Sequence, residues 1–539
     1  MVGVAGKSKG CKTCRQRKIA CGLQRPQCLQ CVKSNRVCLG YERERIFVPV
    51  QPTAKDKKTV MKSSFDEIKK TASTNRESTA TAGVKRDSSH GALTRYAAPG
   101  ISAEILSNAT YRQHLLNAFV ASCISGEQLG PNARHWLMLL PDFLMRTKAL
   151  ETSSMAISAA ALGRIYGDPV LVRESLKLYT RGLRELQKAL WNPKLMYDDE
   201  VLAACLALSM YEIMECPAEA WHAYAIHCKG FLRLVQLRGV DAHTSGIAHE
   251  LFVGLRTQGI LFSLEAHHPT FLSDPPWMQG PWKDTPKRLL DRLVDCLAVA
   301  PGIIKQSDGF KNLRSKQLLD SALDIVRQCW QLDAALQGIY EDLKEETSGP
   351  LYWSVLSEED NPADDPKHGK VFPVAFQFSD LKMAGTLMMY WAITVMLWSG
   401  LCSLYQFIAT IEMDPVDAYC PHYPNCRDDT FCRCRNLILT PSGSLRFNPS
   451  KLPPLGHRID FMTPACNVCQ SVEYCLKSPM MIAGVFAVSA PLNMVFETVR
   501  HNPGCARETA WMKATLEKIQ NKGVRILKYY HEKSAKSAG

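Results

Sequence analysis

The chain has 539 residues, of which 46% are hydrophobic and 22% are charged, and its formal net charge is +13. This length and apolar content allow one or two large packed domains. An odd total of 21 cysteines, with no secretory signal at the start, argues against a secreted disulfide scaffold and predicts a reducing compartment.

Six cysteines near the N-terminus form two copies of a C-x2-C-x6-C spacing, offset by 17 residues. They are Cys11, Cys14 and Cys21, then Cys28, Cys31 and Cys38. Because each Zn²⁺ takes about four ligands, six thiolates satisfy two ions only if two thiolates bridge both. The repeat predicts a two-zinc module of two helix-plus-strand halves, held by metal rather than by a core. A disulfide framework, or one four-thiolate zinc with two spare thiols, would leave the repeat unexplained.

Basic residues are concentrated in the same segment. Residues 1–45 contain eleven lysines and arginines against two glutamates, a net charge of +9. The second half offers only Lys33 and Arg36, whereas the first half carries a denser set on one short predicted helix: Lys12, Arg15, Arg17 and Lys18. Such a surface suits phosphates and guanine edges, so we expect double-stranded DNA as the partner and the first helix as its reader.

Residues 11–38 resemble the fungal binuclear zinc cluster, the Zn2Cys6 DNA-binding domain of the galactose-regulator type. Arg15, Lys18 and Pro26 stand where that family's pattern has Arg, Lys and Pro. The resemblance implies that Cys11 and Cys28 bridge two zinc ions. It also implies that Lys18 reads a CGG-type triplet, with Arg17 sharing base or phosphate contact. Ala20 departs from the Lys or Arg that the family often has before the third cysteine, which removes one phosphate contact.

Residues 46–101 have the composition of a flexible linker, with a run of Ser, Thr and Ala and few large apolar residues. Apolar residues recur at helical spacing only from Val60 to Ile68, which is about one heptad. A stable coiled coil needs three or four heptads. Dimerisation directly after the zinc module is therefore not expected, and a homodimer would form through the helical domain.

From residue 102 the apolar pattern is helical, and the sequence predicts a mostly α chain: a small Zn2Cys6 domain at 1–45 and a large all-α domain at 102–533. The predicted helices are 104–122, 134–147, 150–166, 169–191, 199–214, 218–238, 246–265, 287–300, 316–344, 377–412, 462–477 and 507–531. The segment 218–239, with its Trp, His, Gly and closing Arg-Gly, resembles a helix of the fungal transcription factor regulatory domain. We interpret His222 and His227 in it as ordinary helix residues.

Three further features each have more than one interpretation. Residues 383–411 are uncharged and long enough to cross a bilayer, but their polar and glycine content favours a buried helix, so no membrane partner is expected. A second cysteine cluster, at residues 420–434 and 466–475, has irregular spacing and favours buried or loop thiols over a third zinc or a redox pair. Residues 341–365 mix acidic and aromatic side chains; a surface loop with a disordered tail is favoured over a coactivator-docking segment.

No phosphate-binding loop, HExxH zinc motif or strand-anchored GxGxxG is present, so no enzyme activity is expected. The sequence therefore predicts a nuclear, sequence-specific transcription factor with two Zn²⁺ ions per chain that contacts DNA and transcriptional coregulators. The resemblance suggests control of metabolic or secondary-metabolite genes. An RNA-binding or purely structural zinc protein, and an enzyme or small-molecule receptor in the helical region, are the alternatives.

Overall fold

The computed structural model describes residues 11–17, 19–24, 27–38, 109–124, 135–217, 221–414, 431 and 436–529. Close contacts divide the chain into two units, residues 1–95 and 96–539, and each is described by itself. The predicted linker 46–101, including the heptad at 60–68, lies outside the described residues, as do Pro26 and the cysteines of 420–434. The domain limits 1–45, 46–101 and 102–533 stay predictions.

The first unit contains two short helices, α1 (Lys12–Gln16) and α2 (Leu29–Lys33), one in each half of the repeat. The first cysteine of each half begins its helix: the Cys11 sulfur accepts from the Cys14 N–H at 3.4 Å, and the Cys28 sulfur accepts from the Cys31 N–H at 3.4 Å. The predicted helices are confirmed, but no strand occurs in the described part of this unit. The Cys11 backbone N–H donates to Cys21 Sγ at 3.3 Å, and not to the carbonyl of a neighbouring strand.

The second unit is helical, and several of its first helices begin directly after a residue whose side chain caps the helix. Asp168 caps the helix that starts at Pro169, and Asp198 and Thr147 cap two others. Pro141 lies in a short 3-10 turn, so the predicted helix 134–147 is reduced to residues 136–142. The elements are α5 (Ala109–Cys123), α7 (Trp136–Leu139), α8 (Lys148–Ile165), α9 (Pro169–Leu190) and α10 (Asp199–Glu215).

The middle of this unit continues the helical pattern. Gly239, with φ of 81°, ends the helix whose closing Arg-Gly predicts a stop there. His222 is exposed and His227 half-buried on that helix. The elements are α11 (Trp221–Arg238), α12 (Gly246–Glu265), α13 (Pro275–Gln279), α14 (Leu289–Asp308) and α15 (Ser315–Glu346).

The C-terminal part adds two small antiparallel sheets to four helices. In one sheet β1 (Trp353–Leu356) pairs with β2 (Val374–Gln377); in the other, β5 (Leu445–Phe447) lies between β3 (Glu412–Met413) and β4 (Leu437–Leu439). The helices are α16 (Leu381–Thr410), α18 (Met462–Leu476), α19 (Met481–Val499) and α20 (Ala506–Asn521). The helix α19 is absent from the predicted set, and α20 ends ten residues early because Gly523 follows it with φ of 121°.

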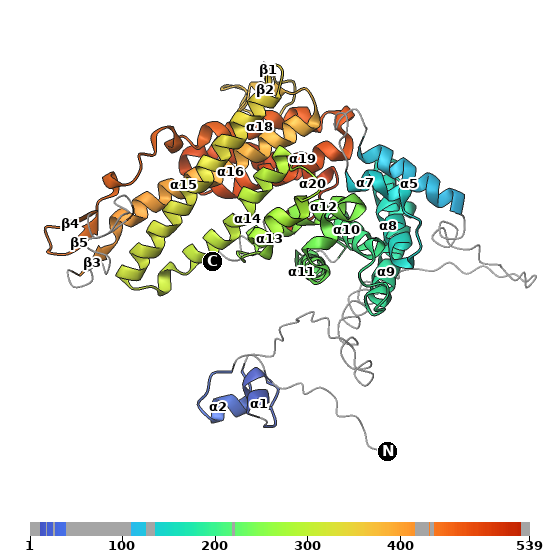
Figure 1. Ribbon diagram of the computed structural model, residues 1–539, viewed down its shortest axis with the longest axis horizontal. Helices are drawn as coiled ribbons and strands as arrows, with labels where there is room; N and C mark the ends of the chain where they lie inside the picture. The colour runs from blue at the N-terminus through green and yellow to red at the C-terminus, as the bar shows by residue number, and fades with distance from the viewer. Residues whose placement is uncertain are drawn as a thin grey trace, which may run out of the picture. The chain divides into compact units, whose positions relative to one another are not determined.

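Two helices of the second unit are long and apolar enough to cross a membrane by length and composition alone, α16 and the segment Ser478–Val499 that contains α19. In Figure 1 they lie among the other helices of their unit, with α15 beside α16. The α16 side chains Leu387, Met388 and Val395 and the α19 side chains Leu492 and Val495 are fully buried. Both helices therefore have the burial of core helices.

The acidic and aromatic segment 341–365 is folded, in contrast to the predicted surface loop with a disordered tail. Its first residues complete α15, and Trp353–Leu356 pairs as β1. Tyr352 packs edge-on against Trp391 of α16, with ring centroids 5.4 Å apart. The Asn361 side chain donates to Thr515 Oγ1 of α20 at 3.0 Å. Aromatic contacts and side-chain hydrogen bonds to distant helices thus order a stretch whose local composition favours solvent.

Candidate metal centre and nucleic-acid interface

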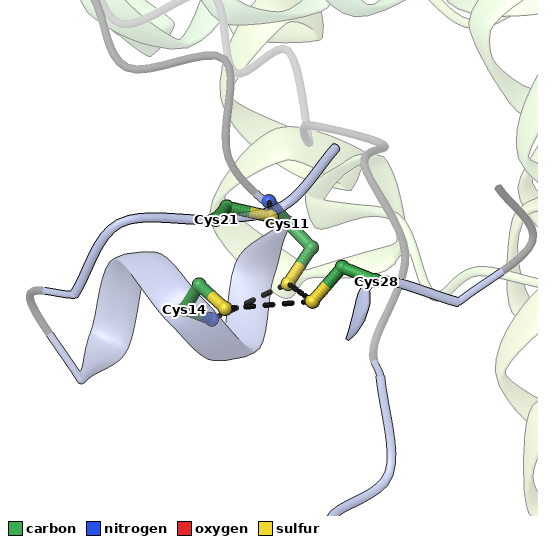
Figure 2. A group of neighbouring side chains, drawn as sticks. All are labelled: Cys11, Cys14, Cys21 and Cys28. Carbon is green, nitrogen blue, oxygen red and sulfur yellow. Dashed lines mark hydrogen bonds between the residues drawn. The ribbon is translucent and has the colours of Figure 1, made fainter. Parts of the chain in front are cut away.

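The structure brings all six cysteines of the repeat together. Their sulfur atoms form two groups of four, and within each group all sulfurs lie within 4.8 Å of one another: Cys11, Cys14, Cys21 and Cys28, and then Cys11, Cys28, Cys31 and Cys38. Cys11 and Cys28 are common to both groups. Figure 2 shows the first group, with the sulfurs of Cys11, Cys14 and Cys28 pointing toward one another from α1 and the start of α2.

The sulfur spacing fits zinc. In a tetrahedral site with Zn–S bonds of about 2.3 Å, two sulfurs on the same ion lie about 3.8 Å apart. The Cys28 sulfur lies 3.6 Å from that of Cys11 and 3.5 Å from that of Cys14, and the Cys11 and Cys31 sulfurs are 3.7 Å apart. Four sulfurs at this spacing fit a tetrahedral zinc site. The module therefore carries the donor set of a binuclear zinc cluster.

Burial of the thiols shows why this unit needs metal. Cys11, Cys14, Cys28 and Cys31 are fully buried and form its entire buried cluster. Removal of the sulfur from water raises the pKa of the Cys11 thiol to about 12 and raises the pKa of Cys14 and Cys31 as well. Closely packed thiolates repel one another, so a divalent cation between them is what makes this packing favourable.

Besides the sulfur contacts, side-chain hydrogen bonds of Thr13 and Arg17 join the halves of the described module. Thr13 Oγ1 of the first half donates to the Val37 carbonyl of the second half at 3.0 Å. The Arg17 guanidinium donates to Ser34 Oγ at 3.0 Å, and Ser34 Oγ donates in turn to the Gln30 carbonyl at 2.7 Å. Sequence reasoning missed Thr13 and Ser34. The 17-residue offset would have found one of them, because Arg17 and Ser34, like Cys11 and Cys28, are equivalent positions of the repeat.

Of the four residues predicted to contact DNA, the structure describes the side chain of Arg17 alone. It is exposed at the end of α1, and its hydrogen bond to Ser34 fixes its direction. Lys18 and the side chains of Lys12 and Arg15 lie outside the described residues. In the second half Lys33, in the last turn of α2, and Arg36 are both exposed. The described part of the module thus presents basic side chains from both halves to solvent.

Three cysteines of the second cluster, Cys466, Cys469 and Cys475, lie on α18. Cys469 and Cys475 are buried, and burial raises the pKa of Cys475 to about 12. The Cys475 thiol contacts the Met388 sulfur of α16 at 3.7 Å rather than other cysteines. Cys475 is therefore a packing thiol, and among the described residues Cys466 and Cys469 belong to no group of metal-ligating side chains.

Another titratable cluster lies where α9, α10 and α11 meet. The Tyr179 hydroxyl donates to Glu212 Oε1 and lies 3.3 Å from His227 Nε2. Tyr179 stacks on Tyr211 with centroids 4.5 Å apart. Burial raises the pKa of Glu212 to about 7, against the opposing effect of the Tyr179 hydrogen bond, and lowers the pKa of His227 to about 4. His227 is thus a helix residue, as predicted, but one that packs beside a buried carboxyl group.

Comparison with known proteins agrees with this geometry. Residues 9–45 match the fungal Zn(2)-Cys(6) binuclear cluster domain, and residues 111–259 match the fungal specific transcription factor domain. The uncharacterized protein AN5342 of Emericella nidulans is 27% identical over 199 residues, which are 35% of this chain and 42% of that protein. The chain therefore spans less than half the length of this relative. No solved structure matches it significantly.

Both matched families are domains of transcription factors and not of enzymes. The zinc cluster domain is a DNA-binding domain, and it coincides with the thiol groups and with the basic segment of the chain. Its match covers residues 9–45, and the second match begins within α5 and ends in α12 of the helical unit. From these observations, the chain carries a fungal Zn(2)-Cys(6) binuclear cluster domain at residues 9–45 and a fungal specific transcription factor domain at residues 111–259.

Proposed function

We propose that this protein regulates transcription by reading CGG-type triplets in double-stranded DNA through its zinc module. The observation that carries the proposal is the pair of four-sulfur groups that share Cys11 and Cys28. Two Zn²⁺ ions with these two cysteines as bridges would use all six thiolates and satisfy eight coordination positions. Bound metal then fixes α1 at the centre of a basic segment, where its end can approach base edges.

Within this proposal the basic residues have different roles. Lys18, immediately after α1 and Arg17, would donate to guanine acceptors in the major groove, and its neighbours Lys12 and Arg15 would contact phosphates. Arg17 is held by Ser34, so its guanidinium would reach a phosphate beside the reading helix rather than a base. Lys33, on the other half, would contact phosphate alone.

Substitution of Lys18 tests the assignment of the base reader. In the full chain, Lys18→Ala is expected to cost about 1–3 kcal/mol of binding free energy at a CGG-type site and to leave nonspecific affinity nearly unchanged. Lys33→Ala is expected to weaken binding to all DNA sequences alike. It should also reduce the slope of log binding constant against log salt concentration by about one unit. Lys513→Ala, an exposed position on α20, is the control. Equal loss of specific and nonspecific affinity in Lys18→Ala would refute its role as reader.

Competition binding separates duplex DNA from the alternative of an RNA-binding zinc protein. Labelled duplex bound by the full chain should be displaced by unlabelled duplex and not by the same concentration of single-stranded RNA or DNA. Backbone charge alone would bind each polyanion, whereas base reading in a major groove requires B-form geometry. Preference for the single strand would replace the proposal with the alternative.

One zinc module buries too little surface to be selective in a genome. We therefore propose that pairing of two modules comes from the helical domain as a homodimer, and that coregulators also bind there. Light scattering of the full chain with DNA of one and of two triplets is the test. The expected result is a dimer on the two-triplet DNA, and a monomer there with undiminished affinity would contradict it. Nuclear localisation and control of metabolic genes are parts of the same proposal, and genome-wide mapping of bound sites would identify the genes.

A further inference from the structure

The helical unit contains a cleft of about 450 Å³ that no part of the proposed DNA-binding function uses. It lies between the segment 357–375, which includes the start of β2, and the helices α18 and α20. A volume of this size lies within the range of small-molecule sites, about 300–1,000 Å³. The cleft is far in sequence from the zinc module, and all of its lining residues belong to the second unit.

The walls of the cleft are largely apolar and partly aromatic. Trp511 of α20 and Phe372 of the loop before β2 both line it, and their rings meet edge to face with centroids 4.9 Å apart. Val472 and Leu476 of α18 and Ala514 of α20 also line it. A flat or chain-like apolar group would therefore be removed from water on two sides.

The charge around these walls is strongly unbalanced. Seven charged side chains line the cleft, and their net charge is −3: two are the lysines Lys518 and Lys522, and five are acidic, Glu359, Asp360, Asp364, Glu473 and Glu517. Lys518 pairs with Glu359, and Lys370, which is not a lining residue, pairs with Asp360, so three of the five acidic groups, Asp364, Glu473 and Glu517, face only Lys522 among the lining cations. The Glu517 side chain is exposed, and its carboxylate makes no hydrogen bond or ion pair to any other described residue. The cleft therefore attracts cations and repels anions.

Hydrogen bonds hold the cleft open in one shape. The Glu473 carboxylate of α18 accepts from Ser357 Oγ at 2.8 Å and from the Glu359 N–H at 3.4 Å. On the other side, Asn361 Nδ2 donates to Thr515 Oγ1 at 3.0 Å. These bonds tie the acidic loop to both helices. A ligand would meet a site that is already formed and would lose little free energy in ordering it.

We propose that this cleft binds a small organic cation that carries an apolar ring or chain. The protonated amine lies at the carboxylate rim beside Glu517, and the apolar body lies between Trp511 and Val472. A neutral ligand of the same shape loses the electrostatic attraction, and an anion is repelled. The proposal concerns binding alone, so its failure would leave the DNA-binding proposal untouched.

The test compares three ligands with one apolar body and different charges. Tryptamine is the cation, tryptophol the neutral analogue and indole-3-propionate the anion; each is titrated into the zinc-loaded full chain by isothermal calorimetry at neutral pH. Phenethylamine and a longer alkylamine extend the cationic set. We expect saturable binding of at least one amine, weaker binding of tryptophol and none of indole-3-propionate.

Two variants locate the site. Ala514→Phe fills the cleft and should abolish amine binding, whereas Ala510→Phe makes the same change one turn away at an exposed position outside the lining and should not. Glu517→Gln is an exposed change that should not affect folding, and it should weaken amine binding about threefold while leaving tryptophol unchanged. No binding of any amine at millimolar concentration, equal binding of all three indoles, or unchanged binding by both Ala514→Phe and Glu517→Gln would overturn the proposal.

Discussion

The two units of this chain bury cysteines for opposite reasons. In the zinc module the buried sulfurs of Cys11 and Cys28 lie 3.6 Å apart, within two groups of four. In the helical unit Cys123, Cys205 and Cys329 are just as buried, but among the described residues no comparable group of metal-ligating side chains occurs there. Burial raises the pKa to about 12 in Cys11 and in Cys123 alike. Neighbouring sulfur, and not burial or a raised pKa, therefore distinguishes a ligand thiol from a packing thiol.

Removal of zinc should separate the two units most sharply. Structural zinc contributes about 10–16 kcal/mol to the folding of small metal-held modules, whereas the described part of the helical unit contains no group of metal-ligating side chains. Hydrogen exchange of the full chain, measured by mass spectrometry with and without a strong chelator, should show loss of protection in residues 11–38 and none in α16. Metal analysis of the reduced protein should give two zinc ions per chain.

Matched cysteine variants give the control for that experiment. Cys28→Ala removes a sulfur common to both groups and should abolish DNA binding, while Cys228→Ala, a buried thiol of α11, should leave it unchanged. A stoichiometry of one zinc, or a chelated protein that still binds DNA specifically, would contradict the shared-thiolate arrangement.

The helical unit should respond instead to loss of a buried ion pair. Arg458 donates to Asp333 at 2.6 Å, and the Trp398 indole N–H donates to the same carboxylate at 2.8 Å. Asp333→Ala leaves the Arg458 charge buried and should cost about 3–5 kcal/mol of unfolding free energy. Asp324→Ala, whose partner Arg327 is exposed, should cost at most about 1 kcal/mol. Thermal unfolding checks both, and equal effects would show that burial of the Asp333 pair is unimportant.

A glycine contact tests how tightly the helical core is packed. A Cβ atom at Gly484 of α19 would lie 1.9 Å from the Cys475 carbonyl oxygen of α18, so Gly484→Ala must push the two helices apart. We expect a loss of about 1–3 kcal/mol. Gly230→Ala in α11 meets no atom within 4 Å and should be neutral or stabilising by up to about 1 kcal/mol. Chemical denaturation measures the pair, and a stable Gly484→Ala protein would indicate a more loosely packed interface.

The smallest effect is a pH dependence confined to the helical unit. Glu212 has a raised pKa in the folded protein. Its contribution to the free energy of unfolding is therefore present at pH 4.5 and is lost as the pH rises through about 7. His227 has a lowered pKa in the folded protein. Its contribution to the free energy of unfolding is therefore present above pH 6.5 and is lost as the pH falls toward 4. Relative to the unmodified chain, Glu212→Gln should gain stability at pH 7.5 and His227→Gln at pH 5, each by roughly 1–2 kcal/mol. Melting temperatures of both variants at pH 5 and pH 7.5 check this, and a shift in either variant that is the same at both pH values would contradict it.

The zinc module could be predicted almost entirely from spacing, because metal chemistry restricts both ligand type and distance. The shared positions of Cys11 and Cys28 in the two sulfur groups agree with the bridging roles that the family resemblance implies. What spacing could not give is the absence of strands in the described module. In the described module the N–H groups of Cys11 and Cys28 donate to the sulfurs of Cys21 and Cys38, and no local propensity encodes these bonds.

Helices of the second unit could be predicted where apolar residues recur at three- and four-residue spacing with polar residues between them. Helices such as α9 and α11 begin and end near the predicted residues because caps and glycine stops are local signals. The helix α19 was missed because it is apolar on nearly all sides and contains Pro491, so periodicity gives no polar face to detect. The pairing of β1 with β2 depends on partners more than ten residues away, which local composition cannot reveal.

The length and composition of α16 have a consequence for how this protein is made. Its 30 residues leave the ribosome before α18 and α19, which bury it, and α19 is complete only 89 residues after Thr410. At about 5–20 residues per second, synthesis leaves that apolar surface without these partners for roughly 4–18 s. During this interval the nascent chain exposes apolar surface of the kind that aggregates and that chaperones shield. The time for which this surface stays exposed is set by how quickly the last helices follow.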